Sequence, residues 1–339
     1  MSACTATGKR VQILLSTYNG ERFLEKQLDS ILALEDFDEC RVLVRDDGSS
    51  DGTREILRRY ETNERIDVVY GENVGITDSY LWLLQNADPE SDFYAFSDQD
   101  DIWLPQKLVH SKQALARHPG DQPLMCASLS RVIDENDEKL YDLPVPQRGV
   151  SFYNAMVQNV LPGHTQVINR RMREIILSRG MDNVHVIDWW DYLVAACVGT
   201  VEFLPEYTVL HRQHGGNAVG MTETRLQNLR RRLSYIRQGR GNAFSRQLNA
   251  FYHRYRDLMP EEYRLETERF LNSLPRFGSR LRYALSCRAY RQSRKEDLAF
   301  RVLYLLGKYK RSGSKTCPRI FWWNVRNTSS RPASAWSSA

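Results

Sequence analysis

The chain has 339 residues, of which 42% are hydrophobic and 26% charged, a composition typical of a globular protein with a sizeable core. Residues 1–220 hold 21 basic and 34 acidic side chains, residues 221–311 hold 22 and 8, and residues 312–339 hold four basic and no acidic ones. No CxxC pair joins the six cysteines, and no apolar run reaches about 18 residues, which argues against a zinc site, a disulfide framework and a transmembrane helix. The first ten residues lack the apolar core of a signal peptide, so we expect a cytoplasmic location.

Short apolar runs alternate with amphipathic stretches through the first half of the chain. Buried strands are predicted at 11–16, 41–46, 66–71 and 93–97. Helices are predicted between them, at 22–34, 52–62 and 77–87. This alternation predicts βαβ units and an α/β fold with a mostly parallel sheet. The pattern then loosens, and we expect strands at 124–134 and 165–170, helices at 151–159 and 188–198, and one or two strands within 201–217.

The charge distribution divides the chain into segments. We expect an N-terminal extension (1–10), an α/β domain (11–220), a basic helical region (221–311) and a Ser-rich, disordered tail (312–339) in which only IFWWNV is anchored. Three explanations of the basic region stay open. It docks on anionic lipid headgroups, it packs against the acidic domain, or it binds nucleic acid without sequence preference.

Polar clusters follow each of the first four predicted strands: STYNGE, DDGSSDGT, GENVG and SDQDD. Open α/β sheets bind ligands beyond the carboxyl ends of their strands, so four such loops predict a site at one sheet edge. DDGSSDGT fits either a polar clasp for a nucleobase or ribose, or a turn that caps a helix. The patterns GxGxxG, GxxxxGK[ST] and GxSxG are absent, which argues against a dinucleotide fingerprint, a P-loop and an α/β-hydrolase.

Three aspartates, Asp98, Asp100 and Asp101, crowd into SDQDD. Carboxylates this close repel one another unless a positive charge lies among them. Mg²⁺ and Mn²⁺ prefer oxygen ligands, usually one or two carboxylates plus substrate phosphates, so the cluster suits a metal shared with a nucleotide diphosphate. The alternative is that Asp100 or Asp101 caps a helix over residues 102–115.

Together, ILLSTYNGERFLEKQLDSIL, RVLVRDDGSSDGT, ENVG and AFSDQDDIW resemble family 2 glycosyltransferases with the GT-A fold. The later PGHTQVINRR, DWWDYLVA and HRQHGGNAVG are similar to the bacterial rhamnosyltransferase-like branch. The resemblance runs from about residue 11 to residue 220. It implies a Rossmann-like mixed sheet flanked by helices, with the basic helices as a C-terminal appendage.

The resemblance implies a donor site for a nucleotide sugar. Tyr18 would stack on the base, Asp47 would hydrogen-bond the base, Asp98 would bind near the ribose, and Gly75 would allow close backbone approach. Arg212 would neutralise phosphate charge, and its alternative is a surface cation. The full implied donor set is Ser16, Thr17, Tyr18, Asp47, Gly75, Asp98 and Arg212.

The resemblance also implies a metal site, with Asp100 as ligand and His214 close to the metal or diphosphate; the ion would be Mg²⁺ or Mn²⁺. His164 stands where the branch often has a small or sulfur-containing residue. Either it touches the donor sugar, or it is a hydrogen-bonded histidine of the core.

Asp188 is the candidate base that would remove the proton of the acceptor hydroxyl. Its alternative role is to cap the helix that it begins. Asp191, three positions later, is the rival base, although it stands where the branch usually has an apolar residue. Trp189 and Trp190 either stack on an acceptor sugar or pack in the core.

These features predict an inverting, metal-dependent glycosyltransferase for cell-surface polysaccharide such as O-antigen, with L-rhamnose from dTDP-rhamnose as the expected sugar. The expected partners are a nucleotide-sugar donor, a glycan or lipid-linked glycan acceptor and an anionic membrane surface, with no specific nucleic acid. Two alternatives stay open: a sugar-phosphate nucleotidyltransferase, and a non-catalytic glycan-binding relic of the fold.

Overall fold

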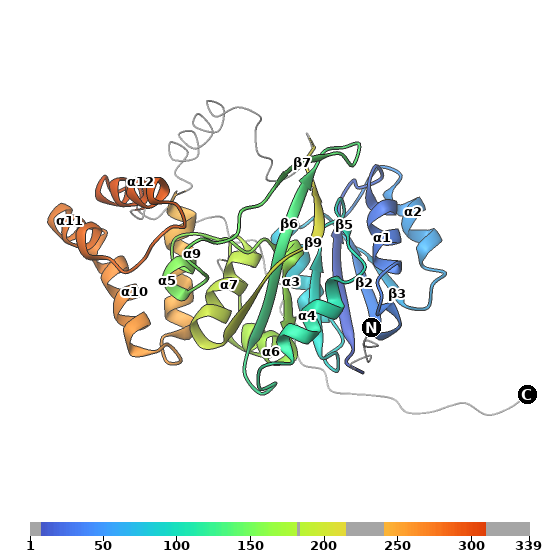
Figure 1. Ribbon diagram of the computed structural model, residues 1–339, viewed down its shortest axis with the longest axis horizontal. Helices are drawn as coiled ribbons and strands as arrows, with labels where there is room; N and C mark the ends of the chain where they lie inside the picture. Colours follow the sequence, from blue (N-terminus) through green and yellow to red (C-terminus); the bar gives the residue numbers. More distant parts are fainter. Residues whose placement is uncertain (1–7, 182–183, 215–240, 310–339) are drawn as a thin grey trace, which may run out of the picture.

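The computed structural model describes residues 8–181, 184–214 and 241–309. The tail from 312, the loop 215–220, the helical expectation for 221–240 and most of the N-terminal extension therefore lie outside the described residues. Within the described part, nine strands form one mixed sheet (Figure 1). They are β1 (Val11–Thr17), β2 (Cys40–Asp46), β3 (Ile66–Tyr70), β4 (Phe93–Ser97), β5 (Ile102–Trp103), β6 (Leu124–Ile133), β7 (Lys139–Asp142), β8 (Val167–Asn169) and β9 (Thr200–Arg212).

The order of the sheet is β3-β2-β1-β4-β8-β6-β9-β5, with β7 paired to β6 off this path. The strands β1 to β4 run parallel, as their alternation with helices predicts. β8 is antiparallel to both β4 and β6, and β9 is parallel to β6. The result is the predicted mixed sheet. The first half of the chain supplies the parallel strands β1 to β4, and the second half adds the antiparallel β8 together with β6 and β9, which run parallel to each other.

Helices cover both faces of the sheet (Figure 1). Along β1, Ile13 and Leu15 pack in one apolar cluster with helix α1, whereas Leu14 packs in the other cluster with helix α7. The helices of this part are α1 (Leu24–Leu32), α2 (Thr53–Tyr60), α3 (Ile76–Asn86), α4 (Lys107–Leu115), α5 (Phe152–Ala155), α6 (Arg170–Arg179) and α7 (Ile187–Val198), with the 3-10 turns η1 (Phe37–Glu39) and η2 (Gly163–Thr165).

Two expected helices are wrong in extent. The helix expected over 151–159 is confined to α5, because Ser151 caps its start and the chain leaves the helix after Met156. The alternative helix over 102–115 begins only at Lys107, since Ile102 and Trp103 pair with β9 as strand β5. Asp100 and Asp101 therefore cap no helix.

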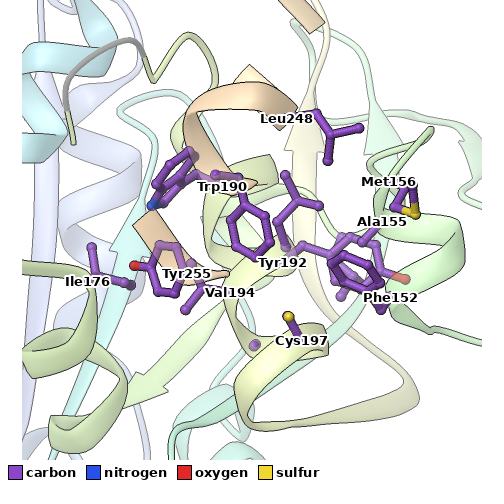
Figure 2. Packing of buried hydrophobic residues seen from close by; sticks show 14 of the residues in the cluster. Phe152, Ala155, Met156, Ile176, Trp190, Tyr192, Val194, Cys197, Leu248 and Tyr255 are labelled. Atoms are coloured by element: carbon purple, nitrogen blue, oxygen red, sulfur yellow. The ribbon is translucent and has the colours of Figure 1, made fainter. Parts of the chain in front are cut away.

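Four further helices follow: α9 (Gly241–Tyr255), α10 (Glu261–Ser273), α11 (Phe277–Ser286) and α12 (Arg294–Leu305). They join the α/β part through apolar contacts, because Leu248 and Tyr255 of α9 pack with Phe152 of α5 and Trp190 of α7 in one buried cluster (Figure 2). The C-terminal arginines that form ion pairs with described side chains contact acids of the same region, as in Arg288–Glu262. Others are Arg264–Glu268, Arg269–Glu266 and Arg301–Asp297.

Among the described residues, apolar packing rather than these arginine ion pairs therefore connects helices α9 to α12 to the α/β part. Across the described ranges, every helix is too short or too polar to cross a bilayer.

Candidate active site

The loops after β1 and β4 are joined by one glutamine. The Oε1 atom of Gln99 accepts hydrogen bonds from Thr17 Oγ1 (2.7 Å) and from the backbone N–H of Tyr18 (2.8 Å). A Cβ atom on Gly20 would lie 2.5 Å from the same oxygen, so a larger residue there would displace the Gln99 side chain that joins the two loops. Tyr18 is 48% exposed at this junction, so its side chain is accessible to a ligand. That Tyr18 stacks on a base stays a prediction.

The loops after β2 and β3 are joined by Asp47. Its side chain is buried, pairs with Arg45, and accepts hydrogen bonds from the backbone N–H groups of Val74 (3.0 Å) and Gly75 (2.9 Å). Gly75 has a φ of +87° and begins α3, with open space where a Cβ would stand. The structure thus brings Asp47 and Gly75 together. Base recognition by Asp47 stays a prediction, and its carboxylate already orders the neighbouring loop.

Ser16 lies at the end of β1, and its Oγ atom is 2.6 Å from Ser79 Oγ on α3. Arg45 donates to the same Ser79 hydroxyl at 3.0 Å. Arg45, Ser79 and Gln99 were not singled out from the sequence. Their polar side chains connect the predicted residues, and the only sequence signal is that they lie in or beside the polar loops.

The three aspartates of SDQDD point to three different partners. Asp98 accepts from the Tyr80 hydroxyl (2.8 Å) and keeps a third of its side chain exposed. Asp100 lies 2.8 Å from His214 Nε2, and Asp101 lies 2.8 Å from His211 Nδ1. The predicted metal pair, Asp100 and His214, is therefore in contact across 114 positions of sequence.

Burial, together with the neighbouring Asp101 and Asp98 carboxylates, raises the pKa of Asp100 above its usual range. Burial alone would lower the pKa of His211, but Asp101, Asp98 and Asp100 outweigh it and raise this pKa to about 9. The imidazolium of His211 and the backbone N–H of Arg212 (3.1 Å) in turn stabilise the Asp101 carboxylate, whose pKa is lowered despite burial. At neutral pH, a protonated His211 is the positive charge among the aspartates.

His164 belongs to this cluster as well. It is buried, its Nε2 lies 3.0 Å from Ser130 Oγ, and its Nδ1 lies 3.5 Å from Asp98 and 3.6 Å from Asp101. Its ring stacks on that of His211, with centroids 4.4 Å apart. A hydrogen-bonded core histidine is thus an accurate description, but this core histidine lines the acidic site.

Two donor sets in this cluster fit a divalent cation. One is the pair of Asp100 and His214. The other is Asp101, His164 and His211, whose ligand atoms lie within 4.8 Å of one another, and His211 would have to lose its proton to bind the ion. Carboxylate oxygen is a ligand that Mg²⁺ and Mn²⁺ prefer, and imidazole nitrogen is a common ligand of divalent transition metals. Asp101 Oδ2 is buried and has no hydrogen-bond partner among the described residues, as expected of an atom that a cation would contact.

Arg212 is fully buried, so the surface-cation alternative is wrong. Its guanidinium donates to the backbone carbonyls of Asp100 and Asp134 (both 3.0 Å) and pairs with Asp137, while it lies over the ring of Phe23. These contacts hold the loop that contains Asp98 to Asp101 against the turn between β6 and β7. A direct contact with phosphate stays a prediction and would require the side chain to exchange partners.

Asp188 lies in the first turn of α7, whose N-terminal cap is Val186, so the capping alternative is wrong. Its carboxylate accepts from the backbone N–H groups of Gly163 (3.1 Å) and Trp189 (2.8 Å). Burial raises the pKa of Asp188 to about 6, against the opposing effect of these hydrogen bonds. Gly163 directly precedes His164 in the chain. The Asp188 carboxylate therefore contacts the backbone next to a member of the cluster around Asp98 and Asp101.

Asp191 faces the interior. It is fully buried, and neither carboxylate oxygen has a hydrogen-bond partner among the described side chains and backbone groups. Burial and the nearby Asp188 carboxylate raise its pKa well above the usual range. A protonated acid without access to solvent is poorly suited to accept a proton from a sugar.

The two tryptophans differ. Trp190 is fully buried, edge-on to Phe251 and Tyr255 of α9, so acceptor stacking by this residue is wrong (Figure 2). Trp189 is partly exposed, with its indole N–H donating to the carbonyl of Ala155 (2.7 Å). A sugar-stacking role for Trp189 stays a prediction.

The chain matches the Glycosyl transferase family 2 profile over residues 12–172. It is also 36% identical over 174 residues to the putative teichuronic acid biosynthesis glycosyltransferase TuaG of Bacillus subtilis, covering 48% of this chain and 68% of that protein. The chain belongs to glycosyl transferase family 2. The matched profile includes the loops of Asp47 and Asp98 to Asp101, whereas Asp188 and His214 lie beyond it.

One further relative and one solved structure are similar to this family 2 member. It is 27% identical over 218 residues to the dTDP-rhamnosyl transferase RfbG of Shigella flexneri, covering 61% of this chain and 73% of that protein. Its fold is similar to that of a mannosyltransferase of Pyrobaculum calidifontis solved in complex with GDP-Man and Mn²⁺. That similarity has a TM-score of 0.52 at 18% identity and covers 88% of this chain and 85% of the other. The predicted GT-A architecture is confirmed.

Proposed function

We propose that this chain is an inverting, metal-dependent glycosyltransferase that transfers a sugar from a nucleotide-sugar donor to a growing cell-surface or lipid-linked glycan. L-Rhamnose from dTDP-rhamnose is the sugar we favour, supported by the similarity to RfbG. The observation that carries the proposal is the contact of Asp100 with His214 (2.8 Å), beside Asp98 and Asp101 and near the Asp188 loop.

In this proposal, Asp188 accepts the proton of the acceptor hydroxyl as that oxygen attacks the anomeric carbon from the face opposite the nucleotide. Its raised pKa of about 6 makes it a stronger base than an exposed aspartate, while most of it is ionised at neutral pH. The two N–H groups that bind the carboxylate fix its orientation. The bond between the anomeric carbon and the diphosphate oxygen breaks, and the nucleoside diphosphate leaves with the bonding electrons.

Asp100 and His214 would hold Mg²⁺ or Mn²⁺, which when bound neutralises the charge on the departing diphosphate. Asp98 would bind near the ribose, Tyr18 would stack on the base, and Asp47 would contact the base edge. Ser16, Thr17 and Gly75 would line this pocket, Arg212 would support the phosphate side, and Trp189 would contact the acceptor. Asp191 is the runner-up base.

A panel of nucleotide sugars tests the proposal, with donor hydrolysis, product formation and protection against melting followed with and without metal. We expect one donor to protect and to be consumed only with Mg²⁺ or Mn²⁺. Asp188→Asn should lose turnover by about 10²- to 10⁴-fold yet keep donor protection.

Asp191→Asn is the matched control and should keep turnover. Loss of turnover in Asp191→Asn but not in Asp188→Asn would reverse the base assignment. Release of pyrophosphate would instead indicate a nucleotidyltransferase, and no response to any donor would indicate a non-catalytic relic.

A further inference from the structure

Helices α11 and α12 pack against each other at the end of the molecule opposite β3 and α2 (Figure 1). Each helix exposes apolar residues at every fourth position, and we call these six residues the apolar stripe. The stripe consists of Phe277 (60% exposed), Leu281 (39%), Leu285 (77%), Leu298 (65%), Val302 (47%) and Leu306 (62%). Scattered surface leucines are ordinary, but two periodic rows on adjacent helices mark an interaction surface.

The opposite faces of these helices are fastened to the protein. Tyr283 of α11 and Tyr304 of α12 are fully buried, with ring centroids 4.7 Å apart, and both pack on Phe270 of α10. Residues two positions apart on a helix point about 200° apart, so Tyr283 faces away from Leu281 and Leu285. The apolar stripe therefore lies on the outer side of a folded, anchored helix pair.

The charge around the stripe is predominantly positive. Residues 276–308 hold nine Lys and Arg against two acids, Glu296 and Asp297. Five of these cations are exposed and form no ion pair with any other described residue, and we call them the basic flank. The basic flank consists of Arg276, Arg282, Arg294, Lys295 and Lys308.

We propose that the apolar stripe and basic flank dock the protein on an anionic phospholipid bilayer, with the stripe entering the headgroup region and the flank contacting lipid phosphates. Apolar side chains beside unpaired cations are what an interfacial surface requires. A second copy of the chain fits less well, because a two-fold contact would oppose two surfaces of the same positive sign. Nucleic acid phosphates would use the basic flank but leave the stripe in water.

The proposed function gives this surface a purpose, since a lipid-linked acceptor is held at a membrane; the docking itself is tested without it. Full-length protein is mixed with vesicles of phosphatidylglycerol in phosphatidylcholine, or of phosphatidylcholine alone, and bound protein is separated by flotation. We expect binding to the anionic vesicles only, weakened by salt.

Two variants separate the parts of the surface. Leu285→Gln with Leu298→Gln should weaken vesicle binding at least tenfold. Arg282→Gln with Lys295→Gln should weaken it about fivefold per charge. Leu140→Gln, at a β7 residue that is 50% exposed, is the matched control and should bind like the parent protein. All variants should keep the parent melting temperature, because the altered side chains are exposed.

Absence of binding to anionic vesicles would overturn the proposal. So would binding that the arginine variant loses and the leucine variant keeps, which would indicate a general polyanion site. Sedimentation showing a dimer that Leu285→Gln dissolves would assign the surface to a second copy. Donor turnover without vesicles should be unchanged in every variant, so failure of the donor panel and failure of docking are distinguishable.

Discussion

Replacing Asp191 by Asn should stabilise the protein increasingly as pH rises. The carboxyl group is fully buried without a hydrogen-bond partner among the described residues, and its pKa is raised well above the usual range by burial and by Asp188. In the unfolded chain the same group titrates near its ordinary value of about 3.9. The contribution of Asp191 to the free energy of unfolding is therefore complete below the unfolded-state pKa and is lost as pH rises toward the native pKa.

The magnitude follows from proton linkage. While the native carboxyl keeps its proton and the unfolded one has lost it, stability falls by about 1.4 kcal/mol per pH unit. Asp191→Asn removes this pH dependence, because an amide does not titrate. It leaves a constant difference in stability, because the buried amide also lacks a hydrogen-bond partner. Both proteins keep Asp188, which raises the pKa of Asp191, and Tyr255, whose own pKa Asp191 raises.

Urea unfolding of both proteins at pH 5, 6 and 7 measures the effect. The difference in unfolding free energy should grow in favour of Asp191→Asn as pH rises, by up to about 1.4 kcal/mol per pH unit while the native carboxyl keeps its proton. Parallel stability profiles would refute the reasoning, since they would show that Asp191 ionises in the native protein as readily as in the unfolded one.

Three further outcomes are expected. The rate of sugar transfer at low acceptor concentration should rise with pH through about 6 as Asp188 loses its proton, and Asp188→Asn should abolish this limb; a limb retained in the variant would assign it to another group. Tyr18→Ala should weaken nucleoside diphosphate binding by roughly 1–3 kcal/mol in calorimetry, and unchanged affinity would exclude stacking. Trp190→Ala should cost about 3–5 kcal/mol in urea unfolding, whereas Trp189→Ala should cost less and raise the KM for acceptor; equal stability losses would contradict the different burial of the two residues.

The parallel half of the fold was predictable because its signals are local. Each of β1 to β4 is an apolar run that ends in a polar loop, and the amphipathic stretches between them repeat with the helical period. The second half of the fold was less predictable. β8 spans only Val167–Asn169, α5 only Phe152–Ala155, and α6 was not predicted at all, because such short or strongly charged elements depend on tertiary contacts that periodicity does not show.

The site was predictable where motif and strand end coincide. Asp98, Asp100 and Asp47 sit in such loops, and His214 was placed by resemblance and lies in contact with Asp100. His211 was missed although it stands in the same HRQH stretch, since nothing in the sequence indicates that it faces Asp101. Trp190 was offered as an acceptor contact because two adjacent tryptophans look alike in sequence, and only the packing of α9 distinguishes them.

The central claim is that Asp100 and His214 together bind a divalent cation with the donor diphosphate. The direct test measures Mn²⁺ bound by the protein, by electron paramagnetic resonance, with and without UDP or dTDP. The exposed His253, replaced by Gln, serves as the control for a histidine elsewhere. We predict that nucleotide strengthens Mn²⁺ binding in the parent and in His253→Gln, and that His214→Ala and Asp100→Asn each weaken it at least tenfold. Equal Mn²⁺ binding by all four proteins would contradict the account.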